Sequence, residues 1–373
     1  MAKAKGGINM SKILIDMRES GTTTGRYMDK LAEHLHKLGP QHQIALLAKP
    51  HRKEYLRIIA PNFEFVETPY REFSLQEQLQ FKKQIEELKP DLVHFPMVQQ
   101  PVLYRGRVVT TMQDLTTLRF RNPTKNTVVF WAKQQIYKAL NKYVAHKSEV
   151  LIAISDFARD DIAAYCGVSP DKFTTTLLSA DPLADRAVVY EPMVGKKFIM
   201  YVGRPLPHKN LGRLIDAFAL LQNNHPDLHL VLAGKKDAAY AMHEKKIVEM
   251  GIKNVVFTGF IEDTQLRWLY ENCQAYIFPS LSEGFGLPAL EAMLHGAPVV
   301  SSNATSLPQV CGDAAHYFDP LDVQDMATKI NDVLSSEKLR ADMIARGKKQ
   351  VKKFSWERMA RQTLEVYEKA LKG

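Results

Sequence analysis

PSLSEGFGLPALEAMLHGAPVV, residues 279–300, joins a strongly apolar run to a helical segment through a turn that contains two glycines. The preceding AYIFPS predicts a buried strand, and the segment from Leu287 predicts a helix whose first turn accommodates a proline. Gly284 and Gly286 have no Cβ atom, so a ligand can approach the main chain closely here. The start of a helix also presents unpaired N–H groups, which suit a phosphate or a sugar hydroxyl. This stretch therefore indicates a binding turn at the end of a strand.

Two carboxylates flank this turn in an E-x7-E frame. Glu283 stands on the loop just before the helix, and Glu291 lies about one turn into it. Glu291 can accept hydrogen bonds from a diol such as a ribose, and Glu283 points into the same space. The alternative is a tight strand-to-helix turn with two solvated carboxylates.

Short apolar runs alternate with amphipathic helical runs along nearly the whole chain, which favours parallel sheets covered on both faces. At 373 residues the chain is long for one core, since single cores stop growing near ~250–300 residues. We predict two doubly wound α/β domains, residues 1–180 and 196–354, separated by a linker over 181–195. Residues 355–373 predict a helix with an apolar face and no strand partner, so it must dock elsewhere.

Two further turns follow predicted strands. In GRPLPHKN, Gly203 ends a strand, and Arg204 and Lys209 flank a proline-rich turn before a helix. Two cations at the carboxyl edge of a sheet favour a clamp for a diphosphate, although a solvated basic loop is the commoner fate of a single cation. In MRESGTTTGRY, Gly21 and Gly25 precede a helix after the first strand, which alone is a weak signal.

Composition narrows the class of protein. Apolar residues make up 45% and charged residues 24%, as in ordinary globular chains. Cys166, Cys273 and Cys311 have neither disulfide-framework nor zinc-site spacing. The first residues lack the apolar core of a signal peptide, and we expect a cytoplasmic protein. The formal charge of +9 favours anionic partners but is equally typical of a basic surface.

Together these turns resemble the family 4 glycosyltransferases of the GT-B fold. The resemblance rests on E-G-F-G-L-P-x-L-E at 283–291 and G-R-x-x-x-x-K-N at 203–210, with support from ISDFARDDI at 154–162. It implies two Rossmann-like domains facing a deep cleft, with the helix at 355–373 crossing back to the first domain. It also implies transfer of a hexose, mannose-like by preference, from a nucleotide-diphosphate sugar to a sugar or lipid-linked saccharide, as in cell-surface polysaccharide synthesis.

The resemblance implies roles for the cationic turn and the helix. Arg204 and Lys209, on the turn opened by Gly203, would neutralise the diphosphate and stabilise it as a leaving group. Glu291 would bind the ribose, and Gly25 would let the first domain close onto the diphosphate.

It also implies how the sugar and the base are held. Glu283 would position the sugar and stabilise charge, together with the main chain of Gly284, Phe285, Gly286 and Leu287. The main chain at Phe260 and Ile261, in FTGFIED, would meet the base, which belongs to a GDP- or UDP-sugar.

The family works with retention at the anomeric carbon and without a metal, so we expect no cofactor. Gln113 stands where many relatives carry a histidine near the transferred sugar, and Asp114 follows it. A glutamine still donates a hydrogen bond to a sugar hydroxyl but does not titrate. Gln113 joins Glu283, Arg204 and Lys209 as the fourth candidate catalytic residue.

Residues 125–147, KNTVVFWAKQQIYKALNKYVAHK, form a basic helical run without acids. We expect its apolar residues, among them Ile136, Tyr137 and Leu140, to pack into the first domain. Contact of the lysines with an anionic membrane on the inner face is an additional hypothesis.

Two other functions stay open at this point. A nucleotide-sugar epimerase on the same scaffold would act without a second sugar. A non-catalytic binding protein or nucleic-acid protein is suggested only by the charge, and no nucleic-acid module is recognisable, so we expect no nucleic-acid partner.

Overall fold

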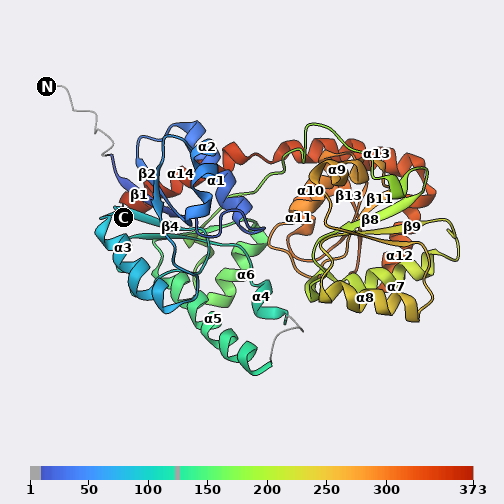
Figure 1. The fold of residues 1–373 in the computed structure, drawn as a ribbon, viewed down its shortest axis with the longest axis horizontal. Helices are drawn as coiled ribbons and strands as arrows, with labels where there is room; N and C mark the ends of the chain where they lie inside the picture. Colours follow the sequence, from blue (N-terminus) through green and yellow to red (C-terminus); the bar gives the residue numbers. More distant parts are fainter. Residues whose placement is uncertain (1–9, 122–126, 373) are drawn as a thin grey trace.

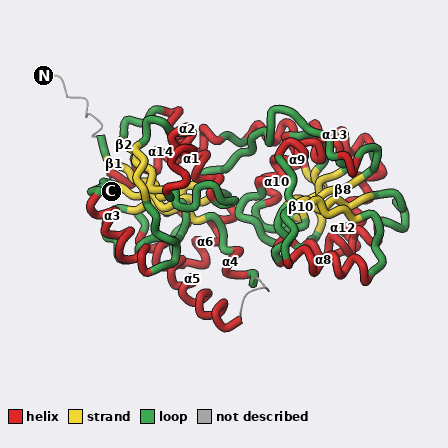
Figure 2. Tube along the Cα trace, viewed as in Figure 1, coloured by secondary structure: helices red, strands yellow, loops and turns green. Residues whose placement is uncertain are grey.

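The structure is a computed structural model that describes residues 10–121 and 127–372. Figure 1 shows two lobes side by side, and Figure 2 shows a central sheet flanked by helices in each. Residues 1–9 and 122–126, which belong to the first predicted domain, and Gly373, the last residue of the predicted terminal helix, lie outside the described residues. Among the described helices, none has the length and apolar composition needed to cross a bilayer.

The first sheet has seven parallel strands in the order β3-β2-β1-β4-β5-β6-β7. Its strands are β1 (Lys12–Asp16), β2 (Gln43–Ala48), β3 (Glu64–Glu67), β4 (Leu92–Phe95), β5 (Val108–Met112), β6 (Val150–Ala153) and β7 (Phe173–Thr175). Between them lie α1 (Gly25–Leu38), η1 (Pro50–Arg52), α2 (Lys53–Ile59), the π-helical turn η2 (Glu77–Phe81), α3 (Lys82–Glu87), α4 (Thr116–Arg119), α5 (Thr127–Lys147), α6 (Asp156–Cys166) and η3 (Pro170–Lys172).

The second sheet has six strands in the order β10-β9-β8-β11-β12-β13, again with parallel pairing. Its strands are β8 (Phe198–Val202), β9 (His229–Ala233), β10 (Val255–Gly259), β11 (Ala275–Phe278), β12 (Val299–Ser302) and β13 (Ala315–Phe318). Its helices are the 3-10 turn η5 (Pro207–Lys209), α7 (Leu211–Leu221), α8 (Ala238–Glu249), α9 (Asp263–Asn272), α10 (Leu287–Leu294), α11 (Leu307–Cys311), α12 (Val323–Ser335) and α13 (Glu337–Gln350).

The central strands are mostly buried, as expected for parallel sheets that helices cover on both faces. Side chains alternate along a strand, and in β1 Ile13 and Ile15 join the cluster that contains α1, whereas Leu14 joins the cluster on the opposite face that contains Ile85 of α3. The same alternation separates Met200 from Tyr201 in β8. The predicted doubly wound α/β fold with two parallel sheets is therefore confirmed.

The last helix, α14 (Trp356–Lys372), returns to the first domain, as predicted. Figure 1 shows it running from the second lobe to the back of the first. Tyr367 Oη lies 2.7 Å from His94 Nδ1 of β4, and Glu368 Oε1 lies 2.7 Å from His42 Nε2. Burial lowers the pKa of His94 to about 3, so this hydrogen bond joins two neutral side chains at neutral pH. These contacts hold the C-terminal helix against the first domain.

Two local expectations were wrong or incomplete. Strand β13, with the sequence AHYF, escaped prediction because it is a half-buried edge strand without a continuous apolar run. In α5, Ile136 is 66% exposed, although the apolar pattern predicted that it packs inward. The helix instead buries Gln134 and Asn141 and reaches the core with Val144 near its end.

Candidate active site

The two predicted turns of the second domain meet because their strands are neighbours. GRPLPHKN follows β8 and EGFG follows β11, and these two strands pair where the strand order of the sheet reverses. In open α/β sheets ligands bind beyond the carboxyl ends of the strands at such a switch point. The topology therefore places both turns at the position where a ligand is expected.

The EGFG turn is buried from Gly284 to Gly286, and its aromatic side chain packs into the core. Gly286 precedes α10 with φ of 111°, and a Cβ atom there would lie 2.7 Å from Leu307 Cδ2. Phe285 is 3% exposed and packs edge-on against Phe354 of the segment before α14, with ring centroids 5.7 Å apart. Because the Phe285 ring lies in the core, the prediction for Phe285 concerns its backbone alone, and Leu287 is the first residue of α10.

A neighbouring loop that sequence reasoning missed holds this turn in shape. The Glu283 N–H donates to Thr305 Oγ1 over 3.1 Å. Ser306 Oγ lies 2.9 Å from the carbonyl oxygen of Glu283 and 3.0 Å from that of Phe285. Both hydroxyls follow β12, the next strand in the sheet, so the run SSNATS at a strand end was the available signal.

Lys209 reaches the EGFG turn. Its Nζ lies 2.6 Å from Glu283 Oε1, and the two side chains are only 21% and 12% exposed. Asn210, with φ of 58°, fixes the turn because its side-chain amide donates to the carbonyl oxygens of Pro279 and Pro320. The ammonium group and the carboxylate thus form a sheltered ion pair from residues that are 74 positions apart.

Arg204 takes a different partner. Its Nε donates to Asp237 Oδ2 over 2.8 Å, and its side chain is 64% exposed. Asp237 also caps α8 by accepting the N–H groups of Ala239 and Tyr240. Gly203, just before, has φ of 139° and directly follows β8. The structure therefore brings Lys209 to the turn and places the Arg204 guanidinium on Asp237.

Glu291 meets the first domain. Its carboxylate, in a residue that is 6% exposed, pairs with Nη1 of Arg26 at the start of α1. Gly25 precedes that arginine, and a Cβ atom there would lie 1.9 Å from the carbonyl oxygen of Glu19, so only glycine fits. Glu291, which was predicted to bind the ribose, and Gly25, which was predicted to let the first domain close, therefore lie at the same contact between the two domains.

The first domain also touches the EGFG turn directly. A Cβ atom on Gly284 would lie 2.6 Å from the Gln113 carbonyl oxygen and 3.0 Å from Asp114 Oδ2. Ser155, which caps α6, donates its hydroxyl to the Gly284 carbonyl oxygen over 2.6 Å. Within the described part of the chain, Gln113 Nε2 is buried and has no hydrogen-bond partner, so it is free to donate to a ligand.

Two titratable groups at this junction were not predicted as site residues. Burial raises the pKa of the Asp114 carboxyl; the Thr116 N–H and hydroxyl act in the opposite direction, and the negative charge of Glu283 raises it further. Burial lowers the pKa of His208 to about 4, and the adjacent Lys209 acts in the same direction. His208 is therefore neutral at neutral pH beside the cation that precedes α7.

Phe260 and Ile261 lie further along the same sheet edge. They follow β10, and β9 and β8 separate that strand from β11. Phe260 is 75% exposed, whereas Ile261 is partly buried against the core. The structure therefore places these two residues apart from the Lys209–Glu283 pair, on the side where a long ligand would extend.

In sequence, residues 189–350 match the family described as glycosyl transferases group 1, and residues 24–176 match glycosyltransferase family 4. The O-antigen chain mannosyltransferase B of Escherichia coli is 31% identical over 274 residues, which cover 70% of each chain. The serotype-specific mannosyltransferase WbdA of the same species is 32% identical over 245 residues, which cover 61% of this chain and 29% of WbdA.

In structure, this chain is similar to Anabaena HepE, which was solved in complex with UDP-glucose. The TM-score is 0.73 at 16% identity, and the match covers 96% of this chain and 99% of HepE. This likeness confirms the GT-B arrangement of the fold.

Proposed function

Since this chain belongs to the glycosyltransferases of group 1 and family 4, we propose that it transfers a mannose-like hexose from a nucleotide-diphosphate sugar, with retention. The observation that carries this proposal is the sheltered Lys209–Glu283 pair at the start of α10, at the switch point of the second sheet. The acceptor is a saccharide or a lipid-linked saccharide, as in the synthesis of cell-surface polysaccharide.

The donor diphosphate would take the place next to Lys209. The N-terminal N–H groups of α10 and the ammonium group would face the phosphate that bears the sugar. Arg204 would rotate away from Asp237 to the diphosphate, which its 64% exposed side chain allows. Glu283, released from Lys209, would hold the sugar hydroxyls together with the main chain at Gly284.

In the transfer step, the bond between the anomeric carbon and the phosphate oxygen breaks, and the acceptor oxygen bonds to that carbon on the same face. The acceptor hydroxyl proton passes to the departing phosphate oxygen. Lys209 and the helix start stabilise the negative charge that develops on that oxygen, without a metal ion. The Gln113 amide orients the sugar by donating a hydrogen bond, and it takes no part in proton transfer.

The nucleoside would lie along the sheet edge from α10 to β10. Glu291 would accept hydrogen bonds from the ribose hydroxyls, which requires that Arg26 releases it. The main chain at Phe260 and Ile261 would contact the base. Donor binding would thus exchange three existing ion pairs, Arg204–Asp237, Lys209–Glu283 and Arg26–Glu291, for contacts with the ligand.

The donor sugar is proposed from the relatives. Two of them are mannosyltransferases, and a structural neighbour holds UDP-glucose, so a GDP-sugar and a UDP-sugar are the donors to compare. A thermal-shift panel of GDP-, UDP- and ADP-sugars tests this choice, since a ligand that binds only the native state raises the melting temperature. Product analysis with the donor alone distinguishes transfer from epimerisation, because an epimerase needs no acceptor.

We also propose a peripheral contact between α5 and an anionic membrane. Trp131 is 55%, Ile136 66% and Tyr143 47% exposed on this helix, and lysines lie between them. Tyr143 Oη donates to the Val102 carbonyl oxygen, which places the 58% exposed Leu103 next to the helix. Apolar side chains among lysines suit the interface of an anionic bilayer.

Liposome flotation tests this contact with vesicles that contain or lack anionic lipid. We expect binding only to the anionic vesicles, and weaker binding after Ile136→Ser. Absence of binding at every salt concentration would remove the membrane from the proposal and leave the transfer reaction untouched.

A further inference from the structure

One short segment of the second domain contacts both the EGFG turn and the first domain. It runs from Thr305 to Gln309, after β12 and into α11. Thr305 has φ of 54°, a conformation that a β-branched residue rarely adopts. Such strain persists only where the surroundings fix it, and here the Thr305 hydroxyl accepts the N–H of Glu283 over 3.1 Å. The strain indicates that this segment does more than join two elements.

The segment and the first domain together bind the carbonyl groups of the EGFG turn. Ser306 Oγ lies 2.9 Å from the Glu283 carbonyl oxygen and 3.0 Å from that of Phe285. The carbonyl oxygen between them, that of Gly284, accepts from Ser155 of the first domain over 2.6 Å. Because protein hydroxyls bind these successive carbonyl groups, a ligand at this turn meets its N–H side.

Asp156, the residue after Ser155, binds Gln309 in both directions. The Asp156 N–H donates to Gln309 Oε1 over 2.9 Å, and Gln309 Nε2 donates to Asp156 Oδ2 over 2.7 Å. The other carboxylate oxygen, Oδ1, accepts from the Thr175 hydroxyl over 2.8 Å and from Arg159 Nη1 over 3.0 Å. The Asp156 side chain is therefore held by its own domain while it contacts the second domain.

A pair of hydroxyls also joins the domains close to Gln113. Thr116 Oγ1 lies 2.8 Å from Ser282 Oγ, and the two residues are 8% and 5% exposed. The Gln113 carbonyl oxygen itself lies against Gly284, as described above. These contacts place Gln113 next to the turn that carries Glu283.

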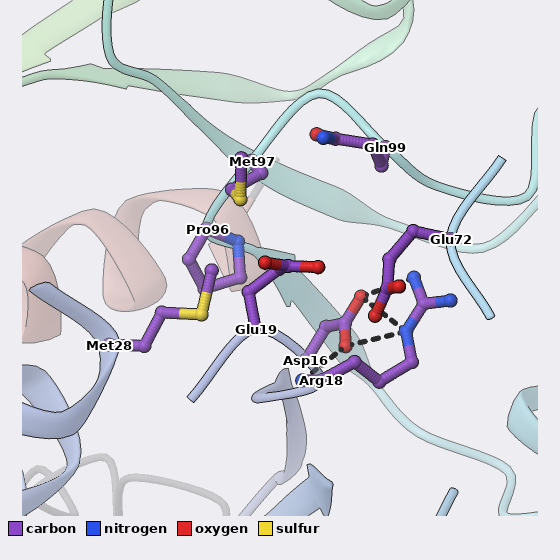
Figure 3. Close-up of a pocket in the computed structure, with 8 residues that line it drawn as sticks. All are labelled: Asp16, Arg18, Glu19, Met28, Glu72, Pro96, Met97 and Gln99. Atoms are coloured by element: carbon purple, nitrogen blue, oxygen red, sulfur yellow. Dashed lines mark hydrogen bonds and ion pairs between the residues drawn. The ribbon is translucent and has the colours of Figure 1, made fainter. Parts of the chain in front are cut away.

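The contact between Arg26 and Glu291 starts from a rigid part of the first domain. Arg18 anchors the beginning of the loop that leads from β1 to Arg26, because its Nη2 donates to Asp16 over 2.7 Å and to Glu77 over 2.8 Å. Figure 3 shows the pair of Arg18 and Asp16 at the wall of a hollow that has room for about one water molecule and is too small for a sugar. This ion-pair network therefore serves to fix the loop.

We propose that Ser155, Asp156 and Gln309 are positioning residues that align the two domains for sugar transfer. The inference rests on the proposed function, because it takes Gln113 of the first domain and Glu283 of the second to hold the same sugar. Groups on separate domains act together only while the domains keep one orientation, and a misplacement of about 1 Å costs about 100-fold in rate. The Asp156–Gln309 pair supplies this orientation, because its two hydrogen bonds run in opposite directions and fix an angle as well as a distance.

The main test exchanges the two partners. Gln309→Glu sets a carboxylate against Asp156 Oδ2, and we expect the repulsion between like charges to separate the domains. In the double variant Asp156→Asn/Gln309→Glu, the new amide donates to the new carboxylate. The asparagine carbonyl oxygen still accepts from Thr175 and Arg159, so the double variant restores the contact.

Two readouts separate alignment from simple stability. We expect Gln309→Glu to increase the radius of gyration in small-angle X-ray scattering without donor, and to lower kcat by about 10–100-fold. The double variant should restore the radius and most of kcat. The matched control is Gln222→Glu, because Gln222 Nε2 donates to the Lys253 carbonyl oxygen over 2.7 Å within the second domain. If Gln309→Glu has the radius and the kcat of this control, the proposal is overturned.

A second variant replaces Gln309→Glu if that protein fails to fold. Ser155→Ala removes the bond to Gly284 and the cap of α6, in which the Ser155 hydroxyl accepts the Ala158 N–H over 3.1 Å. Ser336→Ala removes a similar cap from α13, where the hydroxyl accepts the Leu339 N–H over 3.1 Å. Since both variants lose a cap, an additional fall in kcat of about tenfold in Ser155→Ala belongs to the contact between the domains. Equal kcat in the two variants would overturn the proposal.

The two proposals fail separately, because the scattering experiment needs no substrate. An unchanged radius and unchanged turnover in Gln309→Glu would refute only the alignment of the domains by this pair. Absence of turnover by the wild type with every nucleotide sugar would refute the proposed function, and a larger radius in Gln309→Glu would still support the contact.

Discussion

Lys209→Ala removes the cation that pairs with Glu283 at the start of α10. If Lys209 stabilises charge on the departing diphosphate, its loss resembles the loss of one oxyanion donor, which lowers kcat by a factor of about 100–1000. That factor corresponds to ~2.7–4 kcal/mol of transition-state stabilisation. The affinity for the acceptor should not change, because the ammonium group lies in the donor turn of the second domain.

The same change also costs stability, since it leaves Glu283 without its partner. Breaking a fully buried pair costs ~3–5 kcal/mol, and for side chains that keep 21% and 12% exposure we expect ~1–3 kcal/mol. In a chain of 373 residues that lowers the melting temperature by roughly 1–4 °C, so the protein stays folded at 25 °C.

The assay compares steady-state release of nucleoside diphosphate by the wild type, by Lys209→Ala and by Lys246→Ala. Lys246 pairs with Asp216 between α8 and α7, with both side chains about one-third exposed, so its loss removes an ion pair away from the site. We expect less than a twofold effect on kcat in that control. If Lys209→Ala transfers sugar as fast as Lys246→Ala, the assignment of the donor turn is refuted.

Three further changes test the surroundings of the site. Gly286→Ala should lower the free energy of unfolding by ~2–3 kcal/mol in calorimetry, because φ is 111° and the new methyl group meets Leu307. Arg26→Ala should tighten nucleotide binding in titration calorimetry, since it frees Glu291 for the ribose; weaker binding would show that Arg26 contacts the nucleotide itself. Folding raises the pKa of the Asp114 carboxyl, so this group stabilises the fold while it is protonated and loses that contribution as the pH rises above about 4. Asp114→Asn should therefore raise the melting temperature at pH 7 but not near pH 3.

The fold was predictable because the apolar runs and the glycine- and proline-containing turns that follow them predict the same alternation of strands and helices along the chain. The EGFG and GRPLPHKN turns follow strands whose adjacency results from the doubly wound order, so Lys209 and Glu283 were expected to converge. Residues without an apolar signature escaped, as β13 shows with its half-buried AHYF. The exposure of Ile136 was not predicted either, because the spacing of apolar residues predicts a helix but not which side chains another element covers.

Side-chain partners were less predictable than backbone turns. The pairing of Arg204 with Asp237 depends on a loop from another strand, and nothing in GRPLPHKN indicates it. Phe285 shows the same limit, since its side chain packs on Phe354, a residue far along the chain. The contacts of Asp114 and Ser155 with the EGFG turn exist only because two domains meet there. Such contacts depend on the tertiary arrangement and leave no local pattern.

The most direct measurement is NMR of a reaction that contains the purified chain, GDP-mannose or a UDP-hexose, and mannobiose. One-bond carbon–proton coupling at the new anomeric centre reports its configuration. We predict one equivalent of nucleoside diphosphate per sugar transferred, and an α-linked product from the α-linked donor. A β-linked product, or a donor that changes its sugar without any acceptor, would contradict the account.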